Sequence, residues 1–154
     1  MQIELLPPLG AGPIRIGVPL AEAESIVGAI DGYTPPDPLY PQQRGFATFA
    51  SGLSIALLPD IAGRVTAIEI FRSDYDDVYF DGVDVFRTPA DEVIAFLESR
   101  TQVRVEEDGR TVVAPGLPMS LWRGTLPDFP GDEDGRYFES ALVAGQGYFA
   151  IPGN

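Results

Sequence analysis

The sequence contains no cysteine and no histidine, and its ten basic residues are all arginine, so lysine is absent too. Without cysteine the chain has no disulfide, no thiolate nucleophile and no Cys-ligated zinc or iron–sulfur site. Without histidine it lacks the side chain best suited to proton transfer near neutral pH and the commonest imidazole metal ligand. The absence of lysine excludes Schiff-base chemistry and a P-loop. Most familiar kinds of active site are therefore excluded.

A long apolar segment is also missing. The longest uncharged runs, Gly45–Pro59 among them, are shorter than the roughly 20 residues of a membrane-spanning helix. The stretch from Met1 to Gly12 lacks the basic and then apolar pattern of a secretory signal. We expect no membrane contact and a cytoplasmic location.

Acidic residues greatly outnumber basic residues in the sequence. The chain carries 23 acidic residues against ten arginines, a formal charge of −13. Residues 1–73 hold seven of these acids and four arginines, whereas residues 74–154 hold sixteen and six. Nucleic acid is an unsuitable partner because phosphate neutralisation needs a basic patch. A basic protein or a divalent cation would be attracted instead, although acidity also serves simply to keep a protein soluble.

Two apolar stripes with helical spacing predict two helices, each introduced by a proline. The first stripe follows Pro19 and comprises Leu20, Ala23, Val27 and Ile30. The second follows Thr88, expected as the N-cap, and Pro89, and comprises Ala90, Val93, Ile94 and Leu97.

Alternating and β-branched segments surround the two helices and predict strands. In the first half these are 14–16, 45–50, 53–58 and 64–71; in the second they are 83–86, 102–106, 110–114, 117–122 and 136–143. Asp108-Gly109 is the strongest hairpin signal. The order of elements predicts an α+β fold of two tandem β-α-β-β-β repeats, 1–73 and 74–154, with helices on one face of antiparallel sheet. The two repeats could also form one continuous domain.

The Gly17-Val18-Pro19-Leu20 turn into the first helix resembles the small βαβββ modules of the β-lactamase-inhibitor-like and outer-membrane-assembly lipoprotein folds. The chain is also similar to short acidic proteins of actinobacterial type that are suspected of being toxin-immunity proteins. It departs from the first group in lacking disulfides and a secretion signal, so the resemblance does not imply inhibition of an extracellular lactamase. No functional residue is carried over from it.

The densest acidic cluster lies where the two halves join, at Asp74, Asp76, Asp77, Asp81 and Asp84, interleaved with aromatic residues that include Tyr75. Such a cluster could chelate Ca²⁺ or Mg²⁺, present charge and an aromatic anchor to a basic partner, or form a solvated linker held extended by repulsion. The spacing does not match an EF-hand. The turn Asp132-Glu133-Asp134-Gly135 fails the same test and is interpreted as an acidic turn.

Aromatic residues elsewhere supply the other candidates. Tyr33 and Tyr40 lie in a proline-rich loop, where side chains are exposed and available for binding. Trp122, with Met119, Leu121 and Phe129, could line a pocket, but an aromatic residue at the end of a strand is more often packed in the core. The residues predicted to contact a partner are Tyr33, Tyr40, Asp74, Tyr75, Asp76 and Asp77.

These observations favour a non-enzymatic acidic binding protein, such as an immunity or inhibitor protein for a basic partner, with no catalytic residues, no cofactor and no metal. One alternative is an enzyme that uses only carboxylates, either a metal-assisted hydrolase or a glycosidase. Another is a structural module that oligomerises through its sheet edges. Neither the oligomeric state nor the partner's identity follows from the sequence.

Overall fold

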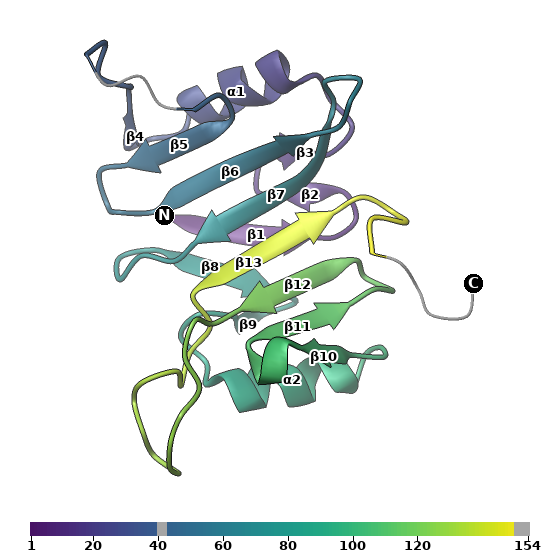
Figure 1. Cartoon of the computed structure of the whole chain (residues 1–154). Helices are drawn as coiled ribbons and strands as arrows, with labels where there is room; N and C mark the ends of the chain where they lie inside the picture. Colours follow the sequence, from purple (N-terminus) through teal and green to yellow (C-terminus); the bar gives the residue numbers. More distant parts are fainter. Residues whose placement is uncertain (40–42, 150–154) are drawn as a thin grey trace.

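The computed structural model describes residues 1–39 and 43–149, which form two helices and thirteen strands and confirm the α+β class (Figure 1). The strands make two sheets. The larger has the order β10-β11-β12-β13-β7-β6-β5-β4, and the smaller has the order β3-β2-β1-β8-β9. Figure 1 shows the smaller sheet behind the larger one, with α1 near the β4–β5 edge and α2 near the β10–β11 edge.

The larger sheet is antiparallel throughout and contains strands from both halves of the chain. Its members are β4 (Tyr33–Thr34), β5 (Phe46–Phe49), β6 (Ser54–Pro59), β7 (Val65–Phe71), β10 (Arg104–Glu106), β11 (Thr111–Ala114), β12 (Met119–Trp122) and β13 (Ser140–Ala144). β4 to β7 run from one edge to the middle, and β10 to β13 run from the other edge, so β7 and β13 pair at the centre. The predicted hairpin at Asp108-Gly109 is confirmed, since a 3₁₀ turn (Glu107–Gly109) joins β10 and β11 there.

Both helices lie where the apolar stripes predict them, as α1 (Leu20–Gly28) and α2 (Ala90–Glu98). Each proline stands one position earlier than expected: Pro19 and Pro89 are the N-caps themselves, with non-helical ψ angles of 145° and 140°. The Thr88 cap is therefore wrong, and no side chain caps α2. Within the described residues, neither helix is long and apolar enough to cross a membrane.

The smaller sheet is the main difference from the sequence-based expectation. It consists of β1 (Gln2–Leu6), β2 (Gly10–Ala11), β3 (Ile14–Arg15), β8 (Asp77–Phe80) and β9 (Val83–Asp84). β1 pairs in parallel with β8, placing Ile3 opposite Val78. Ile3 and Leu5 alternate with Gln2 and Glu4 and are buried, so the amino-terminal segment forms a strand ahead of the first predicted one, 14–16.

One face of the larger sheet forms the core. Ile55, Ile68, Ile70, Leu121 and Val143 point to this face and join a single apolar cluster with residues of the smaller sheet and of the buried helix stripes. Both halves contribute to this cluster. The smaller sheet and the two helices therefore cover the same face of the larger sheet.

The opposite side of the larger sheet, called here the open face, carries Phe46, Leu58, Phe71, Trp122 and Leu142. No helix or strand of the described residues packs on it, and in Figure 1 it is turned towards the viewer.

Trp122 is 39% exposed on this face, which overturns its predicted core position. A pocket shared with Met119 and Leu121 is equally impossible, because successive side chains of β12 alternate between faces and these two residues point into the core.

Candidate functional site

The acidic segment between the halves is not a solvated linker. Residues 77–80 form β8, whose Val78 is fully buried beside β1. Asp77, Val78 and Tyr79 alternate as a half-buried strand requires, and this pattern outweighs the repulsion among the aspartates. The segment is therefore fixed in the fold, and each acidic side chain has a definite environment.

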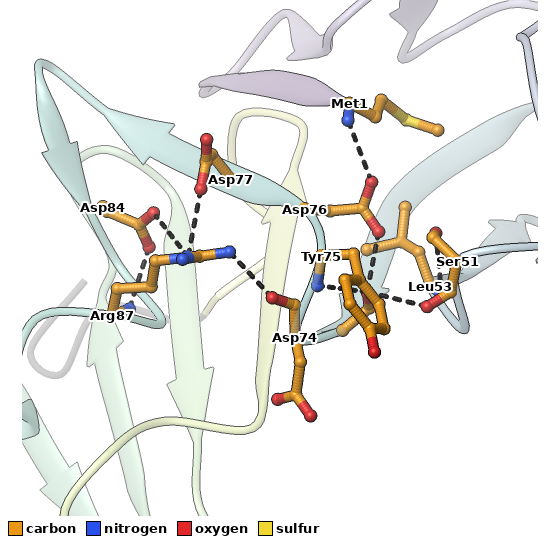
Figure 2. Close-up of polar contacts among 10 residues, drawn as sticks. Met1, Ser51, Leu53, Asp74, Tyr75, Asp76, Asp77, Asp84 and Arg87 are labelled. Atoms are coloured by element: carbon orange, nitrogen blue, oxygen red, sulfur yellow. Dashed lines mark hydrogen bonds and ion pairs between the residues drawn. The ribbon is translucent and has the colours of Figure 1, made fainter.

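Asp76 is the most buried of these acids, with 2% of its surface exposed. One of its oxygens lies 3.2 Å from the Met1 ammonium, and the other accepts a hydrogen bond of 2.7 Å from the Ser73 hydroxyl (Figure 2). Burial alone would raise the pKa of Asp76. Hydrogen bonds from Ser51 and Ser73, together with the Met1 ammonium, outweigh burial and lower the pKa below its ordinary value. Asp76 therefore anchors the segment internally, and its predicted role as a partner contact is not supported.

This lowered pKa predicts an acid-sensitive contribution to stability. The carboxylate binds its proton less readily in the folded chain than in the unfolded chain, so its stabilising effect is complete above about pH 4 and is lost as the pH falls through the folded value. Urea unfolding of wild type and Asp76→Asn should therefore give free energies that differ most at about pH 6 and approach one another as the pH falls below about 4. A difference that stays constant across this range would contradict the prediction.

Asp77 and Asp84 both face Arg87 (Figure 2). The Arg87 Nε lies 3.0 Å from Asp77 and 3.8 Å from Asp84, and its terminal nitrogen donates to the Asp74 carbonyl at 2.9 Å. Asp84 also accepts the backbone N–H groups of Phe86 and Arg87, both at 2.9 Å. These contacts fix the turn that leads to α2, and they leave Asp77 only partly available to a partner.

Asp74 and Tyr75 are the predicted residues that point outward. The Tyr75 side chain is 79% exposed, while its backbone N–H donates to Ser73 Oγ at 3.1 Å. The Asp74 carboxylate is exposed and points away from Arg87 in Figure 2. An aromatic ring and a carboxylate are thus displayed on a turn that is held from below by Ser73 and Asp76.

Arg72 and Tyr137 line two adjoining hollows beside this turn. The first, of about 410 Å³, is completed by Ser73, Asp74, Phe86 and Arg87. The second, of about 390 Å³, is completed by Thr125, Glu133, Asp134, Gly135 and Glu139. We call Arg72, Asp74, Tyr75, Glu133, Asp134 and Tyr137 together the junction surface. The acidic turn that failed as a calcium loop belongs to this surface, which unites acids far apart in the sequence.

Arg72 and Tyr137 were not predicted as site residues. Arg72 directly follows β7 and donates to the Phe138 carbonyl at 3.2 Å, and Tyr137 lies in an irregular segment before β13. No sequence motif marks either residue, because the hollows form only when the end of β7 meets the segment before β13.

The two loop tyrosines have different outcomes. Tyr33 belongs to β4 and packs edge-on against Phe49, with ring centroids 6.1 Å apart, so it is partly buried against the core. Its predicted role as an exposed contact is therefore not supported. Tyr40 lies outside the described residues.

A metal centre would require several oxygen ligands around one point. Among residues 1–39 and 43–149, no group of three or more acidic side chains is arranged to hold a metal ion. Asp77 and Asp84 do approach a common point, but Arg87 occupies it.

No protein-family model, curated protein or solved structure matches this chain.

Proposed function

We propose that the protein is a non-catalytic acidic binding protein whose junction surface recognises a basic protein. The observation that carries this proposal is the display of Tyr75, 79% exposed, beside the Asp74 carboxylate on an internally anchored turn. Exposed aromatic residues often supply much of the affinity at protein interfaces. A turn already held in place loses little conformational entropy when it binds.

The charge of the surroundings supports a cationic partner. Asp74, Glu133 and Asp134 border the two hollows, and the whole chain has a formal charge of −13. A partner's arginine or lysine can enter the second hollow, where Glu133, Asp134 and Glu139 outnumber the single arginine and Tyr137 offers an aromatic ring. Attraction between opposite net charges would also speed association at low ionic strength. Neutralisation of a basic enzyme by an immunity or inhibitor protein is one such function.

We also propose that the two halves arose by duplication and that the protein acts in the cytoplasm. The duplication is supported by the repeated order of one helix followed by four antiparallel strands. The cytoplasmic assignment is supported by the absence of cysteine from the sequence.

Tyr75→Ala should weaken partner binding at least about 10-fold, because an exposed aromatic anchor is removed. Its free energy of unfolding should stay within about 0.5 kcal/mol of wild type, because the side chain is a surface one. Wild type and variant would be compared as baits in a native lysate, and the affinity of the recovered partner would be measured by calorimetry.

Tyr148→Ala is the matched control, because Tyr148 is also exposed but lies after β13, outside the junction surface. It should bind like wild type. Binding by wild type should also weaken as salt is added, because the attraction between charges is screened. The proposal would be overturned if the wild-type bait recovered no basic protein in greater amount than the Tyr75→Ala bait does. An affinity for the partner that does not change with salt would overturn it as well.

A further inference from the structure

The open face differs in composition from the rest of this highly charged molecule. Phe46 and Trp122 are 38% and 39% exposed there, and Leu58, Phe71 and Leu142 are half-buried. Along the six strands β5–β7 and β11–β13, all of them described, the other outward positions are alanine, serine, threonine and valine, with Glu69 as the only charge. A solvated sheet face is normally polar, so this one has the character of a contact surface.

We propose that the open face binds the open face of a second copy of this chain. Two sheets stack well face to face at about 10 Å separation, and a two-fold arrangement places the same apolar surface on both sides. Large side chains such as Phe71 and Leu142 alternate with small ones such as Ser140 and Ala144. This relief allows two copies to interdigitate. The proposal goes beyond the proposed function and uses a different surface.

The size of the open face suits a dimer. Six strands about 4.8 Å apart, each about five residues long at about 3.3 Å per residue, span roughly 29 by 17 Å. Two facing copies would therefore bury on the order of 1,000 Å², which is the lower bound expected for a specific interface. Only one carboxylate per copy would have to be desolvated.

The edges of the larger sheet offer much less surface for binding a second copy. The edge strands β4 and β10 have two and three residues, and β10 carries an Arg104–Glu106 ion pair of 2.7 Å. Short edges with charged side chains resist strand-to-strand pairing. The face, and not the edge named by the oligomerising-module alternative, is the route by which this chain meets its copy.

Glu69 determines how the dimer should respond to charge. It lies on β7 near the middle of the sheet, where its carboxylate accepts a hydrogen bond of 3.1 Å from Ser140. A two-fold dimer brings the two Glu69 side chains towards one another near its axis. Removing this repulsion with Glu69→Gln should tighten the dimer by about 5-fold or more. Added salt should also strengthen the dimer, whereas it should weaken binding to a basic partner.

The test is sedimentation of the purified chain over a wide concentration range, in low and in high salt. Wild type should shift from the 16.6 kDa mass of one chain to twice that value. Trp122→Glu should raise the dissociation constant at least about 30-fold, as should Ser120→Glu, which adds a charge without removing any apolar side chain. Ile61→Glu is the matched control, because Ile61 is fully exposed at the β6–β7 turn, outside the face.

A wild-type chain that remains monomeric in high salt would overturn the proposal. So would a dimer that Ile61→Glu weakens as much as Ser120→Glu does. If Trp122→Glu fails to fold by circular dichroism, Ser120→Glu and Glu69→Gln decide the matter, and a tighter Glu69→Gln dimer cannot result from misfolding. Because Tyr75 lies outside the open face, Tyr75→Ala should leave the dimer unchanged, which separates failure here from failure of the proposed function.

Discussion

Replacing Asp76 with asparagine should lower the free energy of unfolding by about 3 kcal/mol at neutral pH. The substitution removes the charge that faces the Met1 ammonium, and it weakens the acceptor of the Ser73 hydrogen bond. Asp76 itself is only 2% exposed. Met1 is 39% exposed, so the ammonium can be hydrated after the substitution, and the loss comes from the weakened hydrogen bonds to the buried position 76 together with the lost ion pair. Urea unfolding of the chain with a free amino terminus measures the effect, and the melting temperature should fall by about 6–12 °C.

Asp77→Asn provides the neighbouring comparison. Asp77 also has a cationic partner, but its ion pair with Arg87 is half-exposed, so the loss should stay below about 1 kcal/mol. Equal losses in the two variants would show that Asp76 is not the internal anchor of the junction turn. The interpretation of Tyr75 as a preorganised contact would then lose its basis.

Replacing Arg123 with alanine should cost about 3 kcal/mol. Arg123 is 6% exposed and ties together three segments: it donates to the Gly135 carbonyl at 2.9 Å and to the Gly109 carbonyl at 3.4 Å, and it lies 3.8 Å from Asp91 at the start of α2. Its guanidinium also lies over the Phe138 ring, 5.6 Å from the centroid. Removing the side chain leaves two carbonyls without this donor and opens a space above Phe138.

Hydrogen exchange should show where this loss acts, with faster exchange in residues 124–137 than in β6 and β7. Arg110→Ala is the control, because Arg110 is exposed, and its stability should change by less than about 0.5 kcal/mol. An Arg123→Ala chain as stable as the control would contradict the view that this arginine holds the long segment between β12 and β13.

The helices and the larger sheet follow from local patterns in the sequence. Val27 and Val93 recur at helical spacing with their neighbours, and Ile55 and Ile70 alternate with smaller or polar residues, so both periods can be recognised without the fold. The α+β class was therefore predictable. The meeting of β7 and β13 was not, because their register depends on packing between residues about seventy positions apart.

The smaller sheet and the open face needed information that is not local. The alternation in β1 is local, but its pairing with β8 is not, and β8 was obscured by the aspartates on either side of it. Trp122 illustrates a further limit. Apolar character predicts burial, but the sequence does not reveal which face of a strand the rest of the chain will cover.

The candidate site was predicted only in part, for a similar reason. Among adjacent acids, the sequence cannot separate Asp76, which is internal, from Asp74, which is exposed, since both fit a polar turn. Tyr75 was correctly placed at the surface, whereas Tyr33 was drawn into the core by its contact with Phe49. The neighbours that decide each case come from other strands.

The pairing of β7 with β13 also has a consequence for synthesis on the ribosome. β7 is complete by residue 71, but its second neighbour consists of residues 140–144. For almost half of translation the strand destined for the centre of the sheet therefore has an unpaired edge of apolar sequence, a known template for aggregation. A chain truncated before residue 140 would leave this edge uncovered, and we expect it to aggregate more readily than the full chain.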